Sequence, residues 1–195
     1  TNEVFRAVSS PDGKLLATAS SDNSACIWEI ATRESICVNH DDSVEDVAFS
    51  RDGQQSATAS ADGSVRLWDA KTGRQLLNVQ HDAAVFRVNF HLEGRYIVSA
   101  SWDSTARVWD TKSGLEVARM VHDGPLDSAV FSPDGQFVAT GSNDFTARVW
   151  TIAFPPEMAS FSTDGVIGAI AFSADNKRLA ITSSGSQLVI IWDFI

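Results

Sequence analysis

Short apolar runs separated by turns recur along the whole chain. After His40, four runs occupy residues 44–50, 56–60, 65–69 and 75–79, and the turns Asp52-Gly53, Asp62-Gly63 and Lys71-Thr72-Gly73 separate them. Runs of this length, rich in β-branched and apolar residues and bounded by Gly and Asp, are typical of β-strands. The pattern predicts four short antiparallel strands, a to d, in this unit.

The same unit repeats at a nearly constant period. The tryptophans that mark it are separated by 40, 41, 41 and 42 residues: Trp28, Trp68, Trp109, Trp150 and Trp192. His40, His81 and His122 follow the same period. A repeat of about 40–45 residues with four strands is typical of a β-propeller blade. We therefore expect an all-β fold, with blades at approximately 1–40, 41–81, 82–122, 123–163 and 164–195, the last without strand d.

Turn chemistry supports these boundaries. The turn between strands a and b has Gly at the end in four units (Gly13, Gly53, Gly94 and Gly135), and Asn176 takes that place in the fifth. Gly adopts the left-handed conformation that such a turn requires, and Asn tolerates it. Phe154-Pro155-Pro156 interrupts the pattern between strands c and d of the fourth unit, so a different loop is expected there.

The strand-c endings Leu67-Trp68-Asp69, Val108-Trp109-Asp110 and Ile191-Trp192-Asp193 carry a signature, with Trp28-Glu29 and Trp150-Thr151 as variants. Through these residues nearly the whole chain resembles the WD-repeat β-propeller family. The resemblance implies that Trp on strand c, Ser or Thr on strand b, His before strand a and Asp in the b–c turn are linked within each blade. Carried over by register, the three sets are His40, Thr58, Asp62 and Trp68; His81, Ser99, Asp103 and Trp109; and His122, Thr140, Asp144 and Trp150.

The strand-b member of each set has a competitor. Ser60, Ser101 and Ser142 lie two residues later and face the same side of the strand, so either hydroxyl could join the set. The chemistry of such a set is clear in both cases. A buried indole N–H needs an acceptor, a buried imidazole needs partners for both nitrogens, and a carboxylate at the end fixes the tautomer.

The first and last units are incomplete. The first has Thr18, Asp22 and Trp28, but its His would fall before Thr1; the fifth has Thr163 in the His place, Ile181 or Thr182 in the hydroxyl place, and Gly185 or Ser186 in the Asp place. No spare strand is available to close a ring. We expect a partial, open propeller of about five blades, with the missing blades supplied by a parent chain or by self-association.

Composition adds limits on function. The 195 residues are 44% hydrophobic and carry a formal net charge of −10, which repels nucleic acid and anionic membranes. No apolar run approaches the ~20 residues that span a bilayer. Cys26 and Cys37 have apolar neighbours, and two buried reduced thiols are favoured over a disulfide. A cytoplasmic setting follows from that expectation.

Candidate chemistry is sparse. Each His comes with its own Asp and Trp on a separate blade, so convergence on a catalytic or metal site is not expected, and no cofactor motif is found. We expect a non-catalytic interaction scaffold or the recognition domain of a larger regulatory protein. The alternatives are a ligand-binding or enzymatic propeller with a polar site in the central channel, and a purely structural subunit.

The resemblance also implies that partners dock on the top face, near the channel. Phe5, Phe86 and Trp102 place aromatic rings there by register, and Trp102 is the one Trp outside the periodic set. Glu45 and Asp127, with other carboxylates (Glu3, Asp41, Asp42, Asp82 and Asp123), make the surround acidic. The predicted partner is a protein or peptide that is basic and partly apolar. Packing of these rings on a neighbouring loop is the competing interpretation.

Overall fold

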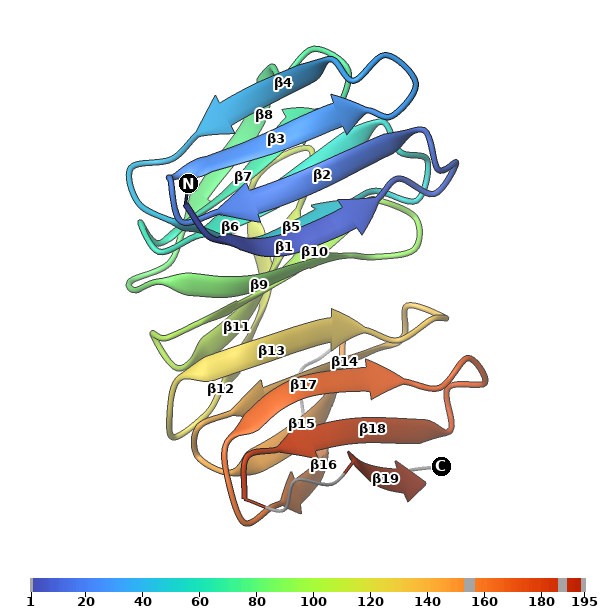
Figure 1. Ribbon diagram of the computed structural model, residues 1–195. Helices are drawn as coiled ribbons and strands as arrows, with labels where there is room; N and C mark the ends of the chain where they lie inside the picture. The colour runs from blue at the N-terminus through green and yellow to red at the C-terminus, as the bar shows by residue number, and fades with distance from the viewer. Residues whose placement is uncertain (1, 153–156, 186–188, 194–195) are drawn as a thin grey trace.

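The computed structural model describes residues 2–152, 157–185 and 189–193. Its regular structure in these ranges consists of β-strands in five antiparallel sheets, which follow one another in chain order (Figure 1). This is the all-β architecture of successive propeller blades that the repeat predicts. No helix in the described ranges is long and apolar enough to cross a membrane.

Each sheet takes its strands consecutively from the chain. Blade 1 contains β1 (Val4–Ser9), β2 (Leu15–Ser20), β3 (Ser24–Glu29) and β4 (Ser35–Asn39); blade 2 contains β5 (Val44–Phe49), β6 (Gln55–Ser60), β7 (Ser64–Asp69) and β8 (Gln75–Gln80). Blade 3 contains β9 (Val85–Phe90), β10 (Tyr96–Ser101), β11 (Thr105–Asp110) and β12 (Glu116–Val121); blade 4 contains β13 (Leu126–Phe131), β14 (Phe137–Ser142), β15 (Thr146–Thr151) and β16 (Glu157–Ser162). Blade 5 contains β17 (Ile167–Phe172), β18 (Arg178–Ser183) and β19 (Val189–Asp193).

The a–b turns have the conformation that their residues predict. Gly53 has a φ of 69°, and Asn176 takes the same place in blade 5 with a φ of 59°. A β-branched or bulky residue would be strained at either position. The departure expected at Phe154-Pro155-Pro156 lies outside the described residues.

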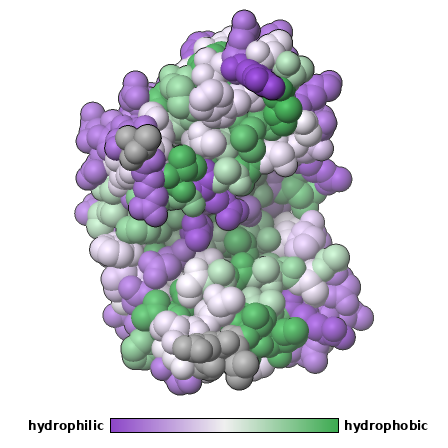
Figure 2. Space-filling model, in the orientation of Figure 1, coloured by the Kyte–Doolittle hydropathy of each residue, from purple (hydrophilic) through white to green (hydrophobic). Residues whose placement is uncertain are grey.

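The blades are joined along their innermost strands. β1 contacts β5, β5 contacts β9, β9 contacts β13, and β13 contacts β17. In the described part of the chain no sheet closes on itself, and no extensive contact leads from β17 back to β1, so the propeller is partial. Figure 1 shows this succession from blade 1 at the top to blade 5 at the bottom, and the same face is hollowed about halfway down in Figure 2.

The hydrophobic core lies between blades. Trp68 packs with Ala17, Ala19 and Val38 of blade 1, and Trp109 and Trp150 pack on their preceding blades in the same way. These three rings are 5–6% exposed, whereas Trp28, on the outer face of blade 1, is 38% exposed. Because removing a buried Trp side chain costs about 3–5 kcal/mol, each inter-blade tryptophan contributes strongly to stability.

The expectation for the cysteines is wrong. Cys26 on β3 and Cys37 on β4 form a disulfide, and the two residues are direct cross-strand partners. Cys26 is half-buried and Cys37 is exposed, because both lie on the outer face of blade 1 rather than in an inter-blade core. The apolar neighbours that suggested burial belong to the opposite face of the same strands. The argument for a cytoplasmic setting therefore loses its premise.

We predict that the folded protein has no thiol that reacts with a maleimide until a reductant is added, after which two become reactive. Cys26→Ser with Cys37→Ser should lower the free energy of unfolding by about 2–3 kcal/mol, because the bond closes a short loop in the unfolded chain. Mass spectrometry after alkylation and urea unfolding measure the two effects. Two reactive thiols in the non-reduced, folded protein would contradict the assignment.

Candidate functional site

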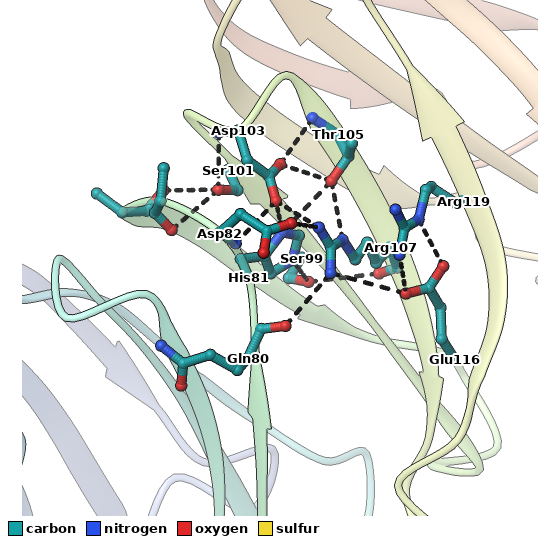
Figure 3. A network of polar contacts seen from close by, with 12 residues as sticks. Gln80, His81, Asp82, Ser99, Ser101, Asp103, Thr105, Arg107, Glu116 and Arg119 are labelled. Carbon is teal, nitrogen blue, oxygen red and sulfur yellow. Dashed lines mark hydrogen bonds and ion pairs between the residues drawn. The ribbon is translucent and has the colours of Figure 1, made fainter.

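A hydroxyl at the centre of blade 3 joins a histidine to a tryptophan, and Figure 3 shows the histidine and Ser99, which carries the hydroxyl. His81 Nε2 lies 2.7 Å from Ser99 Oγ, and Trp109 Nε1 donates to the same oxygen at 2.8 Å. His81 Nδ1 lies 2.9 Å from Asp103 Oδ2. An ionised carboxylate can only accept, so Nδ1 carries a proton. In a neutral imidazole Nε2 is then bare, and Ser99 donates to it.

Blades 2 and 4 repeat this geometry with Thr in place of Ser. The distances in blade 2 are His40–Thr58 2.7 Å, His40–Asp62 3.2 Å and Trp68–Thr58 2.9 Å. In blade 4 they are His122–Thr140 2.7 Å, His122–Asp144 3.0 Å and Trp150–Thr140 2.8 Å. The structure thus brings together the four residues of each set.

The competing serines have a separate task. Ser101 Oγ donates to the carbonyl of Ala84 at 2.9 Å and accepts the backbone N–H of Asp103 at 3.0 Å. Ser142 makes the corresponding bonds, whereas Ser60 accepts the N–H of Asp62 and donates to the carbonyl of Asp42, one residue earlier. The second hydroxyl therefore shapes the b–c turn that carries Asp103, and the first joins the imidazole to the indole.

An arginine that the sequence analysis did not single out completes each network. Arg107 Nη2 lies 2.7 Å from both Asp103 Oδ2 and Asp82 Oδ2, and the whole residue is only 5% exposed. Its Nη1 donates to the carbonyl of Gln80 at 3.3 Å, at the end of the preceding blade's strand d (Figure 3). Arg66 and Arg148 occupy the same place in blades 2 and 4, each two residues before the strand-c Trp. That shared period was the signal available in the sequence.

Burial and hydrogen bonding together lower the pKa of both the aspartate and the histidine of the network. Burial alone would raise the pKa of the Asp103 carboxyl, but hydrogen bonds from His81 and Thr105 outweigh it and hold that pKa far below its ordinary value. Burial lowers the pKa of His81, despite the nearby charge of Asp103. The same cause, aided by the charge of Arg66, lowers the pKa of His40. The networks around these two residues therefore hold a charged carboxylate and a neutral imidazole at pH 7.

The terminal blades keep only parts of the network. In blade 1, Trp28 Nε1 donates to Thr18 Oγ1 at 3.2 Å, and Asp22 accepts from Ser24. In blade 5, the buried Ile181 takes the place of the hydroxyl. Gly185 stands at the position of the turn Asp, since its N–H donates to Ser183 as the N–H of Asp103 donates to Ser101 in blade 3. Thr163 bonds only to backbone carbonyls, and Ser186 lies outside the described residues.

A separate aromatic cluster lies at the b–c turn of blade 3. The rings of Trp102 and Phe86 stack with centroids 4.5 Å apart and planes 21° from parallel. Trp102 Nε1 donates to Asp127 Oδ1 at 3.0 Å, across the boundary to blade 4. The backbone N–H of Trp102 is held by the carbonyl of Ala84. Trp102 is nevertheless 49% exposed, so it is a rigidly held surface ring rather than a core residue.

Phe5 and Glu45 occupy the place of Phe86 on the innermost strands of blades 1 and 2. Phe5 is 42% exposed, and Glu45 accepts a hydrogen bond from Ser43 at 2.5 Å. Among the described residues no direct contact joins either of them to the Trp102 stack. We therefore define the aromatic patch as Trp102, Phe86 and Asp127, with Phe5 and Glu45 farther along the same row of strands.

The negative charge predicted around the aromatic residues is weaker than the number of carboxylates suggests. Asp41, Asp82 and Asp123 each pair with the network arginine of their blade at 2.7–3.3 Å, although their side chains are exposed. Their charge is thus largely balanced locally. In the described ranges, no group of three or more His, Cys, Asp or Glu side chains is placed to hold a metal ion.

Comparison with family models gives a match over nearly the whole chain. The WD40 family, described as WD domain, G-beta repeat, matches residues 1–29, 32–69, 74–110, 116–151 and 157–193. From the second match on, each contains strand d of one blade and strands a to c of the next. No curated protein matches the chain.

Asp103→Ala should lower the free energy of unfolding by about 1–3 kcal/mol, because it leaves the buried His81 N–H and Arg107 without their shared acceptor. Asp82→Ala is the matched control: it removes the other carboxylate that contacts Arg107 Nη2, but that carboxylate is 83% exposed and its loss should cost less than about 1 kcal/mol. Urea unfolding measures both. Asp62→Ala and Asp144→Ala should destabilise the protein as Asp103→Ala does. Equal, small effects of Asp103→Ala and Asp82→Ala would show that Asp103 does not hold the network together.

Stability should fall as the pH is lowered from 7.5 to 5. The pKa of His40 and His81 in the folded protein lies below 6.5, so under that value the unfolded chain takes up protons that the folded blades refuse. The contribution of these histidines is complete above about pH 6.5 and is lost as the pH falls. The lowered pKa of Asp103 adds a loss in the same direction, but only below about pH 4. A melting temperature unchanged between pH 7.5 and 5 would contradict this, and His81→Gln should reduce the dependence.

Proposed function

The chain belongs to the WD40 family, whose members are generally protein-interaction scaffolds, and on that premise we propose that it recognises a peptide segment of a partner protein through the aromatic patch. The observation that supports this most is the exposed, immobilised Trp102. The blade networks are complete without it, and a large ring held at the surface by a stacked neighbour and a hydrogen bond needs another explanation. Such rings are frequent energetic centres of protein interfaces.

The geometry favours a partner with a positive charge next to an apolar group. Phe86 covers one face of the indole, which leaves the other side of the ring system to solvent. An Arg or Lys side chain can lie over an open indole face by cation–π attraction. Asp127 at the edge of the ring supplies a carboxylate beside it, and Glu45 lies farther along the same row of strands. The stacked rings supply the apolar contact.

Asp127 has two effects in this proposal. Its hydrogen bond fixes the indole before the partner arrives, so little conformational entropy is lost on binding. Its charge attracts the cationic group, and salt weakens that attraction. A role as the recognition domain of a larger regulatory protein, which we propose as well, depends on this binding mode.

We predict that Trp102→Ala weakens binding of basic, partly apolar peptides by about 30-fold, the equivalent of a 2 kcal/mol hot spot. Peptide arrays that pair Arg or Lys with Leu, Ile, Met or Phe provide ligands, and titration calorimetry measures them. Leu115→Ala is the control, because it removes another exposed apolar side chain from a c–d turn at the opposite end of the blade.

Asp127→Asn separates the two effects of the carboxylate, since the amide oxygen can still accept the indole N–H. It should weaken binding less than Trp102→Ala does, and the difference from the parent should shrink as salt is added. Unchanged affinities for Trp102→Ala, in a protein that melts at the parent temperature, would exclude the aromatic patch as the interface.

A further inference from the structure

The innermost strand of each blade carries a β-bulge at the end that adjoins the b–c turn. In β9 the register shifts between Val85 and Arg87, which leaves Phe86 as the extra residue, and the other four strands shift at the equivalent place. Bulges re-aim the side chains around them. Two rows of residues therefore cross the blades: the extra residues are Phe5, Glu45, Phe86, Asp127 and Gly168, and the residues that follow them are Arg6, Asp46, Arg87, Ser128 and Ala169. We call these the bulge row and the post-bulge row.

The post-bulge row brings three charged side chains together from three successive blades. Asp46 Oδ1 lies 3.4 Å from Arg6 Nε and 4.0 Å from Arg87 Nη1. The same position is uncharged in blades 4 and 5, so the repeat itself does not require charge there. Two guanidinium groups face one carboxylate, and at least one positive charge therefore has no counter-charge within the cluster. We call Arg6, Asp46 and Arg87 the charged triad.

Burial differs sharply within the charged triad. The side chain of Asp46 is 4% exposed, and its Oδ2 accepts the backbone N–H of Val88 at 3.1 Å, whereas Oδ1 receives no hydrogen bond. The side chains of Arg6 and Arg87 are 50% and 36% exposed, and within the described residues neither guanidinium group makes a hydrogen bond. Each guanidinium carries five N–H donors. Asp46 is thus a fixed anchor that attracts two surface arginines without using their donors.

The charged triad adjoins the aromatic patch along β9. Phe86, which stacks on Trp102, and Arg87 are consecutive, so their Cα atoms are about 3.8 Å apart. The charged residues of the bulge row, Glu45 and Asp127, are negative, whereas the charged triad is positive on balance. Figure 2 shows hydrophilic residues beside the hollow of this face. A ligand that is complementary to both rows must carry charges of both signs in a fixed order.

We propose that the charged triad binds a carboxylate of the same peptide segment whose cationic side chain lies on Trp102. This inference rests on the proposed function and specifies the partner further: an Arg or Lys beside an apolar residue, with an Asp or Glu a few residues away. A guanidinium group donates two parallel N–H bonds to a carboxylate, which gives both affinity and orientation. The single charge of a carboxylate matches the charge that Asp46 leaves unbalanced.

The test uses octapeptides that contain Arg-Leu and a Glu at each distance from it, on either side, and matched peptides with Gln in place of Glu. Titration calorimetry measures their affinities. At least one Glu peptide should bind about tenfold more tightly than its Gln counterpart, because its carboxylate gains charge-assisted hydrogen bonds that the amide lacks. Equal affinities within every pair would overturn the proposal.

Variants assign the preference for Glu to the charged triad. Arg87→Gln should weaken the Glu peptide about tenfold and leave the Gln peptide unchanged. Arg51→Gln is the matched control, because it removes the same charge from the exposed start of the a–b turn of blade 2, at the opposite end of the strands. If Arg87→Gln lowers the melting temperature but keeps the parent ratio of the two affinities, the charged triad is structural and the proposal is wrong. Arg6→Gln, at the more exposed arginine, gives a second measurement.

Trp102→Ala separates this inference from the proposed function. It should weaken both peptides of a pair and preserve their ratio, since the carboxylate does not contact the indole. If Trp102→Ala weakens binding but Glu and Gln peptides bind the parent equally, the aromatic patch remains the interface and the charged triad alone is excluded. If Trp102→Ala changes neither affinity, the proposed function fails, and the inference fails with it.

Discussion

A buried imidazole must satisfy both of its nitrogens, and this requirement organises the three central blades. His81 does so with Asp103 on one side and Ser99 on the other, and Ser99 in turn accepts the indole N–H of Trp109. The same Trp packs its ring on the preceding blade, so the polar network inside one blade orients the apolar contact between two. Arg107 extends the connection to the backbone of the preceding strand d. Removing a member leaves a buried partner unsatisfied, which explains why the members come as a set.

The terminal blades lack the network arginine. In blade 1 the position of the network arginine is taken by Cys26, which is bonded to its neighbour on β4. In blade 5 the corresponding place is Ile190, and the hydroxyl place is Ile181. Blade 5 also lacks the Asp103-type carboxylate, because Gly185 takes that place, and a guanidinium there would be an unpaired charge, which is costly to bury. An apolar residue therefore takes the place of the arginine in blade 5.

The blades, their turns and most network residues could be predicted from the sequence, because residues that recur at the repeat period occupy equivalent positions in each blade. The tryptophans gave the number of blades, and the turn residues, such as Gly53 and Asn176, gave the strand ends. The role of Arg107 was missed because an arginine within a strand is usually solvated, and only the three-dimensional position of Asp82 shows its second partner. The disulfide was missed because apolar neighbours on alternate positions do not say which face of β3 is covered.

A repeat fold separates structural from functional positions in a way that single domains do not. Residues that recur at the period are explained by the network and the inter-blade core, so a residue that departs from the period without structural need is a candidate for recognition. Trp102 departs by being larger than Ser21, Ala61 and Asn143, and it stays exposed although it is firmly held. This departure adds surface for a partner at a position that the networks holding the blades together do not use.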